Sequence, residues 1–333
     1  MEFSQIFNFV EIGGNNYMLE IDQETTRAAF GKTVLMLARK NDKIFAISND
    51  ALPNMGLGPM LKEFPNRTLN LGIAEQNTMG VAAGLAATGM TVVVGEYAVF
   101  STMRSVEQFR TFIAYPNLNV KVSGGMGGLS AAGEGVTHMG LEDVGIMRLF
   151  PNTIVTVPAD AVSTRLITEA ILKVYGPAYI RLGKGLYYKV FDESYRFVIG
   201  KANLLVEGYD ATIITNGPMV YRSLEAYRKL KNEGIQVRVL EMPCVKPIDE
   251  EAILSAAQET GAIITAEDHT IIGGLGGAVA EILSEQCPTI MKRLGIRDVF
   301  PESGDHDDLM DKYGLAISDV VTAVKEVIAK KSK

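Results

Sequence analysis

The sequence predicts an α/β protein of two domains, each built on a mostly parallel β-sheet covered by helices. Three observations support this prediction. The chain has 333 residues, which suits two domains of ordinary size. Its hydrophobic content of 47%, its charged content of 21% and its 33 glycines are typical of a globular α/β protein. Finally, short apolar runs alternate with segments of helical periodicity, as in parallel βαβ units.

The first alternating series fills residues 21–190, which we expect to form the first domain. Apolar runs predict strands at 43–48, 91–94, 120–123, 153–157 and 178–182. Between them, helical periodicity predicts helices at 25–40, 73–88, 103–115, 141–149 and 161–175. Residues 1–20 show no clear period, and we expect them to form an arm that packs on a partner.

The alternation breaks between residues 184 and 201, where Gly185 and Gly200 accompany mixed aromatic and charged residues, so the interdomain linker is predicted there. Residues 191–333 contain a second series and predict the second domain. Its expected strands are 211–215, 236–242, 262–266 and 291–296, and its expected helices are 219–233, the segment between an Asp249 cap and Gly261, and 318–330.

Charge and cysteine content exclude several classes of protein. The formal net charge is −7 and no long basic run occurs, which argues against nucleic acid as a partner. Cys244 and Cys287 are too few for a disulfide framework or a zinc cluster, and they fit a reducing cytoplasm. No apolar stretch reaches about 18 residues and the N-terminus lacks the basic start of a signal peptide, so we expect a cytoplasmic protein with no membrane partner.

Glu75 is the residue from which a function can be argued. It stands at the head of a predicted helix whose residues 80–87 are mostly Gly and Ala. Small residues let a helix pack closely, so we expect its first turn to be buried. A buried carboxyl group there could exchange a proton near neutral pH. The alternative is an N-terminal Glu that only complements the helix dipole.

Several further motifs occur in one order along the chain. They are residues 67–87 around Glu75, Tyr97-Ala98-Val99-Phe100, Glu107-Gln108, Gly135-Val136-Thr137-His138, residues 149–160, and the run from Glu267 to Gly277. The first five resemble the pyrimidine-binding domain of thiamine-diphosphate-dependent enzymes of the transketolase type, and the last resembles that family's C-terminal domain. The resemblance extends from about residue 25 to the end of the sequence and is strongest to the C-terminal subunit of a split transketolase.

The resemblance implies that thiamine diphosphate binds between two chains, with this chain facing its pyrimidine ring. Glu75 would then hydrogen-bond the ring nitrogen and promote proton transfer. Phe100 matches the ring-stacking aromatic and Tyr97 could line the same face; two core aromatics at a strand end are the alternative. Arg104 matches an arginine near the pyrimidine, or is a solvated helix residue. Asp50 follows a strand and matches an acidic residue on the thiazole side.

The resemblance also implies substrate contacts. His138 follows the glycine-rich stretch 124–135 and matches the family's catalytic, substrate-contacting histidine; a structural histidine is the alternative. Arg181 ends a strand and matches the arginine for substrate phosphate, or forms a surface ion pair. Glu134 stands where the family has an aspartate for donor hydroxyls, and Met126 where it has a phosphate-binding histidine. We therefore expect an altered pocket for a sugar or sugar phosphate, with weak activity on xylulose 5-phosphate and better activity on a modified or less charged ketose.

The family's diphosphate-binding motif, Gly-Asp-Gly followed at a distance by Asn, does not occur in the sequence. Residues 304–308 begin with Gly-Asp but lack the second glycine, and an acidic loop is expected there. The resemblance then implies an N-terminal partner subunit that binds the diphosphate through Mg²⁺ or Ca²⁺, in an α2β2 heterotetramer with a homodimer core. No metal ligand is expected on this chain, which alone would be catalytically incomplete. For His269 we expect a structural role rather than an anion site.

Three functions stay open on the sequence alone. The first is a subunit of a split transketolase, which transfers a two-carbon ketol unit from a ketose to an aldose. The second is the β subunit of a thiamine-diphosphate-dependent 2-oxoacid dehydrogenase, although the residues around Glu75 and His138 favour transketolase. The third is a non-catalytic scaffold subunit, against which the presence of Glu75, Phe100 and His138 argues.

Overall fold

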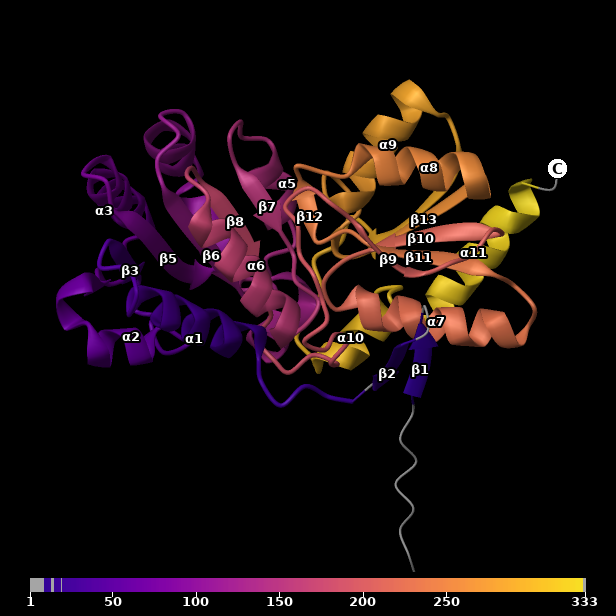
Figure 1. The fold of residues 1–333 in the computed structure, drawn as a ribbon, viewed down its shortest axis with the longest axis horizontal. Helices are drawn as coiled ribbons and strands as arrows, with labels where there is room; N and C mark the ends of the chain where they lie inside the picture. Colours follow the sequence, from indigo (N-terminus) through magenta and orange to yellow (C-terminus); the bar gives the residue numbers. More distant parts are fainter. Residues whose placement is uncertain (1–8, 13–14, 19, 332–333) are drawn as a thin grey trace, which may run out of the picture.

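Two α/β domains lie side by side in this protein. The computed structural model describes residues 9–12, 15–18 and 20–331 (Figure 1). The first domain, indigo to magenta in Figure 1, contains a seven-stranded sheet, and the second, orange to yellow, contains a five-stranded sheet. Helices cover both sheets, and the predicted fold class is therefore confirmed.

Strands of the first sheet run in the order β12-β7-β8-β6-β5-β3-β4, and all neighbours are parallel except β12 and β7. Their bounds are β3 Ile44–Ser48, β4 Thr68–Asn70, β5 Thr91–Tyr97, β6 Val120–Gly125, β7 Ile154–Thr156, β8 Ala178–Arg181 and β12 Cys244–Lys246. The inner strands β5 and β6 are buried almost throughout, as in parallel sheets covered on both faces. Strand β12 comes from the second half of the chain, so the two halves share this sheet.

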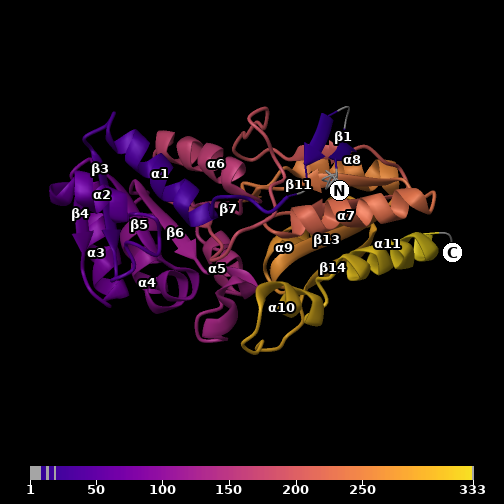
Figure 2. The ribbon, with the colours of Figure 1, turned by 90° about the horizontal axis from the view of Figure 1, so that it is seen from below.

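Helices α1 and α6 pack together on one face of this sheet, and α3 lies on the other (Figure 2). The bounds are α1 Thr26–Ala38, α2 Gly58–Glu63, α3 Glu75–Ala87, α5 Asp143–Arg148 and α6 Ala161–Lys173, with 3-10 turns at Pro65–Arg67 and Gly128–Glu134. The continuous helix predicted over 103–115 is wrong. Two segments with π-helical hydrogen bonding, Phe100–Arg104 and Phe109–Ala114, flank a short α4, Val106–Gln108. Such segments are frequent at functional sites.

The second sheet has the order β14-β13-β10-β11-β9, and only β9 is antiparallel to its neighbour. The bounds are β9 Asn203–Val206, β10 Ala211–Thr215, β11 Val237–Glu241, β13 Ala262–Thr270, β14 Ile290–Ile296, α7 Met219–Asn232, α8 Glu250–Thr260, α9 Leu275–Gln286, α10 His306–Lys312 and α11 Ile317–Lys331. Helices α8 and α9 cover one face, and α7 and α11 the other (Figure 1). Helix α8 begins at the predicted Asp249 cap and ends at Gly261, whose φ is 64°.

The N-terminal arm predicted for residues 1–20 lies partly outside the described residues. Its described part forms a hairpin of β1, Phe9–Ile12, and β2, Asn15–Met18, next to α7 (Figures 1 and 2). Packing of this arm on a partner stays a prediction. Across the described ranges, every helix is too short or too polar to span a bilayer.

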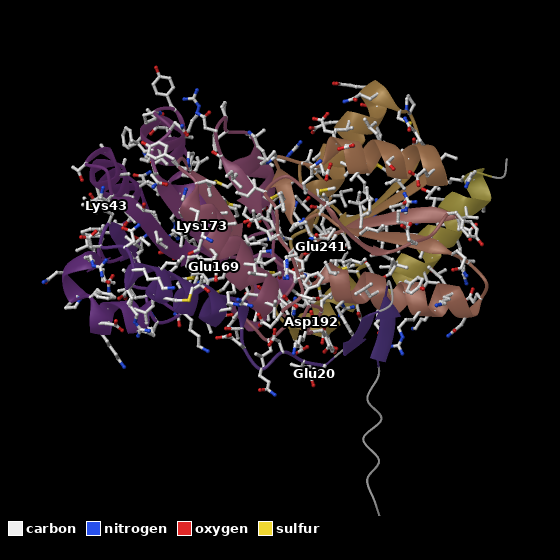
Figure 3. All side chains as sticks on the ribbon, viewed as in Figure 1. Glu20, Lys43, Glu169, Lys173, Asp192 and Glu241 are labelled. Carbon is white, nitrogen blue, oxygen red and sulfur yellow. The ribbon has the colours of Figure 1, made fainter. Side chains whose placement is uncertain are left out.

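The domains meet in a shared apolar core, and the second domain also buries a polar group. Met126 and Leu129 of the first domain belong to the same buried cluster as Ile264 and Leu309 of the second. Glu241, which Figure 3 labels near the middle of the molecule, is fully buried. Its carboxyl oxygens accept hydrogen bonds from Asn203 and Tyr195, and burial raises the pKa of Glu241 to about 8. The junction is therefore a packed interior and not a loose contact between two domains.

Candidate active site

The carboxyl ends of six parallel strands meet at one edge of the first sheet, and the segments that follow them bear most of the predicted site residues. Asp50 follows β3, Glu75 follows β4 and Tyr97 ends β5. The segment after β6 includes Glu134 and His138. In open α/β sheets, ligands bind outside the carboxyl ends of the strands. The fold thus places these residues where a ligand site is expected.

Glu75 is the first residue of α3, and its side chain is only 8% exposed. Its Oε1 accepts a hydrogen bond of 2.8 Å from Nη1 of Arg104, whose side chain is half exposed. The expected burial of Glu75 is confirmed, but close packing of small residues explains it only in part. Buried alanines of α3 make the packing contacts, whereas an added methyl group at Gly80 or Gly84 would meet no atom within 4 Å.

Three rings gather beside this ion pair. The ring of Phe100 meets His138 edge-on, with centroids 5.2 Å apart. Tyr97 lies 6.0 Å from Phe100 and 6.1 Å from His138. The Arg104 guanidinium lies 4.1 Å from the centroid of the Phe100 ring, and so joins the rings to Glu75. We call this group, which contains five of the predicted residues, the Glu75 cluster: Glu75, Tyr97, Phe100, Arg104 and His138.

Asp50 pairs with Asn70 instead of a member of the Glu75 cluster. Its φ of 64° lies in the left-handed region, which is uncommon for a residue with a side chain. Its amide donates to Asn70 Oδ1 at 2.8 Å, and its Oδ1 accepts from Asn70 Nδ2 at 3.1 Å. This reciprocal pair ties the ends of β3 and β4 together. Contact of Asp50 with the thiazole side of a cofactor stays a prediction.

A second set of polar side chains lies beside the Glu75 cluster. Both carboxylate oxygens of Glu134 bind Nζ of Lys184, which follows β8. Arg27 donates to the carbonyls of Lys184 and Asn54, at 2.7 Å each, and Asn54 Nδ2 donates to Tyr97 Oη at 2.7 Å. Burial alone would raise the pKa of Glu134, but the contact with Lys184 lowers it. We call Arg27, Asn54, Glu134 and Lys184 the Lys184 group.

Sequence reasoning found Glu134 but missed the other three members of the Lys184 group. A usable signal existed for Lys184, because it lies just beyond the carboxyl end of a predicted strand, where sites of α/β proteins gather. Arg27 lies in the first turn of α1 and Asn54 in the segment after β3. Neither of these two belonged to a recognisable motif, so their role depends on the folded arrangement.

Arg181 lies in the interior of the protein and not at the surface. Its side chain is 5% exposed, and its guanidinium lies 3.0 Å from Asp143 and binds the carbonyls of Gly140 and Asp268. Tyr179 donates a 2.6 Å hydrogen bond to the same Asp143. Burial alone would lower the pKa of Arg181, but the two aspartates raise it, so the group stays charged. The surface ion pair is therefore wrong, because Arg181 is buried with internal partners, and contact with substrate phosphate stays a prediction that this burial argues against.

Glu96 is a buried carboxyl group close to the Glu75 cluster. It is 2% exposed, and its Oε1 accepts a hydrogen bond of 2.8 Å from the amide of Tyr97. Burial, helped by the charge of Glu75, raises the pKa of Glu96 from 4.5 to about 7, against the lowering effect of the Tyr97 amide. Between these pH values the folded state binds more protons than the unfolded state, so this group's contribution to stability falls as the pH rises.

We expect Glu96→Gln to raise the melting temperature at pH 8 far more than at pH 4.5, because the amide can still accept from Tyr97 but has no charge to bury. The pKa shift from 4.5 to about 7 corresponds to about 3 kcal/mol of unfolding free energy above pH 7. Thermal melts of both proteins at the two pH values measure the effect, and the comparison cancels other titrating groups. An equal change at both pH values would show that Glu96 does not titrate in this range.

Comparison with known proteins gives a consistent family. Residues 22–189 match the family model for the transketolase pyrimidine binding domain, and residues 200–320 match the transketolase C-terminal domain. The chain is 39% identical to a 6-deoxy-6-sulfo-D-fructose transketolase subunit of Clostridium sp. (strain MSTE9), over 95% of this chain and 98% of the relative. It is also 39% identical to an apulose-4-phosphate transketolase subunit of Phocaeicola vulgatus, over 91% and 97%.

A solved structure points to the same family. It is described as a split gene transketolase in an inactive beta4 tetramer, and it superposes with a TM-score of 0.86 at 43% identity, over 92% of this chain and 99% of that chain. The fold and these matches define a subunit of a thiamine-diphosphate-dependent enzyme. The chain belongs to the transketolase family, as a transferase subunit that carries the pyrimidine-binding and C-terminal domains.

The residues of the Glu75 cluster fit the pyrimidine ring of thiamine diphosphate. A buried carboxyl group can bind a ring nitrogen, and Phe100 offers an aromatic surface. Within the described ranges, no group of three or more His, Cys, Asp or Glu side chains could hold a metal ion. The acidic segment 304–308 starts α10, where Asp305 caps the helix by accepting from the Asp307 amide. This chain's residues therefore fit the pyrimidine end of the cofactor.

Proposed function

We propose that this chain is the pyrimidine-side subunit of a split transketolase that transfers a two-carbon ketol unit from an acidic ketose to an aldose. The Glu75 cluster is the observation that carries the proposal, because a buried carboxyl group, an aromatic ring and a histidine converge there. When bound, thiamine diphosphate supplies the nucleophilic carbon that such a transfer needs. A non-catalytic scaffold subunit would have no use for a buried carboxyl group in this place.

Four side chains of the Glu75 cluster have a part in this reaction. Glu75 would hydrogen-bond the ring nitrogen, in a buried setting where water does not compete. Arg104 fixes the Glu75 carboxyl group through their 2.8 Å contact. Phe100 supports the ring by stacking. His138, whose Nδ1 lies 3.0 Å from Thr137 Oγ1, faces the donor and moves a proton at its hydroxyl group.

The Lys184 group supports a donor with an acidic end. Lys184 places a positive charge next to the Glu75 cluster, and phosphate or sulfonate binds such a group through charge-assisted hydrogen bonds. Arg27 adds a second positive charge nearby, although two backbone carbonyls already engage its guanidinium. Lys184 would exchange Glu134 for the anion and release Glu134 toward the donor hydroxyls. Two relatives are named for 6-deoxy-6-sulfo-D-fructose and apulose-4-phosphate, both of which are acidic. Met126 stands where the family has a phosphate-binding histidine, but it is apolar and only 4% exposed. The proposed anion site is therefore the Lys184 group.

Exposed apolar side chains near Glu75 support a partner subunit on this face. Ile73, two residues before Glu75, is 77% exposed, and Phe112, in the π-helical segment that contacts α3, is 45% exposed. Tyr115, just after that segment, is 84% exposed. Apolar side chains that gather at a surface often belong to an interface. The proposed partner is an N-terminal subunit that binds the diphosphate through Mg²⁺ or Ca²⁺, in a cytoplasmic α2β2 assembly with a homodimer core.

The function is tested by co-expressing the chain with a diphosphate-binding subunit from the same organism and assaying a panel of ketose donors. The panel contains 6-deoxy-6-sulfofructose, apulose 4-phosphate, xylulose 5-phosphate and uncharged fructose. We expect an acidic donor other than xylulose 5-phosphate to give the highest kcat/KM. Absence of ketol transfer from every donor would contradict the function. If xylulose 5-phosphate were best by a wide margin, Met126 and Glu134 would not tune specificity.

We expect the isolated chain to bind thiamine diphosphate weakly and to show no turnover. The described residues offer contacts to one end of the cofactor, and most of its charge lies at the other end. Calorimetry with the cofactor and Mg²⁺ measures the affinity, first without and then with the partner. Binding at micromolar or lower Kd by the isolated chain would contradict the division of the site between two subunits.

A further inference from the structure

We propose that Asp268 of the C-terminal domain is a positioning residue for the substrate-binding segment 124–138, and that it thereby sets the affinity for the ketose donor. This inference rests on the function proposed above and adds a contribution from the second domain to the site. Asp268 lies on β13, is 2% exposed and is far in sequence from the segment that it contacts. The contact therefore exists only because the two domains share a packed junction.

Both carboxylate oxygens of Asp268 accept from the backbone amide of Leu129, at 3.0 and 3.2 Å. The preceding residue, Gly128, has a φ of 65°, and a Cβ atom there would lie 2.0 Å from Asp268 Oδ2. Only glycine permits this approach without displacing the carboxylate. The segment is thus shaped to receive the side chain from the other domain.

Neighbouring groups keep Asp268 charged and in place. Arg181 donates to its carbonyl, and the His306 ring lies with Nε2 4.0 Å from its Oδ2. Burial alone would raise the pKa of Asp268, but His306, Arg181 and the Leu129 amide together lower it. The hydrogen bond to Leu129 is therefore made by a carboxylate, and such bonds are stronger than those between neutral groups.

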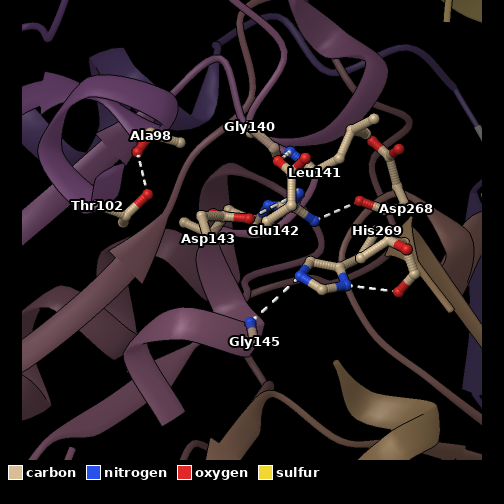
Figure 4. Close-up of polar contacts among 12 residues, drawn as sticks. Ala98, Thr102, Gly140, Leu141, Glu142, Asp143, Gly145, Asp268 and His269 are labelled. Carbon is tan, nitrogen blue, oxygen red and sulfur yellow. Dashed lines mark hydrogen bonds and ion pairs between the residues drawn. The ribbon is translucent and has the colours of Figure 1, made fainter. Parts of the chain in front are cut away.

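The adjacent residue secures the same junction at a second point. Figure 4 shows the ring of His269, the residue after Asp268, next to the amide of Gly145 in α5. His269 Nε2 accepts from the amide of Gly145 at 3.2 Å, and its Nδ1 lies 2.6 Å from the Thr270 carbonyl. This agrees with the structural role expected for His269. Asp268 differs from it because its partner amide lies inside the segment that bears the substrate residues.

The position of Leu129 links Asp268 to the substrate groups. The next residue, Ser130, binds the Gly127 carbonyl at 2.6 Å and accepts from the amide of Lys184 at 3.2 Å. Lys184 in turn binds Glu134, at the end of the same 3-10 turn. A shift of the Leu129 amide would therefore move both partners of the ion pair that we assign to the donor.

The first test measures hydrogen exchange in the whole chain. Asp268→Asn weakens the hydrogen bond between Asp268 and the Leu129 amide by removing the negative charge. Gly128→Ala disturbs the same hydrogen bond from the Leu129 side and leaves the Asp268 carboxylate in the chain. We expect both variants to raise exchange at the Leu129 amide by about tenfold or more, with β10 unchanged. Gly133→Ala is the matched control in the same segment, because a Cβ there would meet no atom within 4 Å. Unchanged exchange at Leu129 in both variants would overturn the proposal.

The second test uses the complex with its diphosphate-binding subunit. We expect Asp268→Asn and Gly128→Ala to raise KM for the donor about fivefold or more, by a larger factor than any fall in kcat and with cofactor affinity within about twofold, because the Lys184–Glu134 pair next to Leu129 moves most. A merely structural role would lower the amount of active enzyme and leave KM unchanged, and that result would overturn the proposal. Lack of activity in the wild-type complex would instead refute the proposed function, while the exchange experiment still decides whether Asp268 holds the segment.

Discussion

Replacing Glu75 with alanine should lower turnover of the reconstituted complex by roughly a thousandfold or more while the chain stays folded. The carboxyl group is the only charged member of the Glu75 cluster whose side chain is almost fully buried among the described residues, and it faces the proposed pyrimidine site. Its loss removes the carboxyl group that would hydrogen-bond the ring nitrogen, which the other cluster members cannot replace. Steady-state kinetics of the complex, with circular dichroism and thermal melts of the isolated chain, measure the two parts of this expectation.

Glu75→Gln should also be severely impaired, because an amide retains the size of the side chain but is a poor proton donor. Glu107→Gln is the matched control, since Glu107 is an exposed carboxylate on the adjacent α4 whose contact is with Gln108. We expect that control to retain wild-type kinetics. If Glu75→Ala kept a rate within about tenfold of wild type, which corresponds to about 1.4 kcal/mol, the assignment of Glu75 would be refuted.

Regular elements of this fold could be predicted from sequence because their signals are local. Helix α8 has its capping aspartate and terminal glycine in the sequence itself. The region 103–115 has a helical pattern, yet it forms π-helical segments. There, Thr102 Oγ1 donates to the carbonyl of Ala98 (Figure 4) and Ser105 Oγ to that of Ser101, which competes with regular backbone bonding. Strand β12 escaped prediction because its three residues depend on pairing with distant β7.

Prediction of the site residues from sequence was limited in a similar way. Glu75 and Phe100 could be placed because they lie in motifs of fixed spacing. Arg181 and Lys184 lie three residues apart near the end of one strand, and sequence alone did not show which of them leaves the sheet. The structure ends β8 at Arg181, so Arg181 packs in the interior and Lys184 extends beyond the sheet edge. The partner of Arg181, Asp143, comes from another element and becomes visible only in the folded chain.

Arg181→Met should destabilise the folded chain by roughly 3–5 kcal/mol, because it leaves Asp143 buried without its cation. Lys184→Met should change stability by less than about 1 kcal/mol, since that ion pair is partly exposed to solvent. Urea unfolding of the two variants and the wild-type chain measures this difference. The two variants thus distinguish Arg181, which holds the domain junction together, from Lys184, which we propose faces the substrate.

In the kinetics of the complex, Lys184→Met should have the larger effect of these two variants on KM for acidic donors. Lys184→Met removes a charge-assisted hydrogen bond to the acidic end of the donor, typically about 1.5–3 kcal/mol, so KM for acidic donors should rise roughly tenfold or more. KM for an uncharged ketose should stay the same, because Lys184 has no anion to bind there. If Arg181→Met unfolded like the wild-type chain and raised KM for acidic donors alone, Arg181 would be the anion ligand after all. A Lys184→Met variant with unchanged kinetics would remove the support for an acidic donor, because Arg27 is already engaged by two backbone carbonyls.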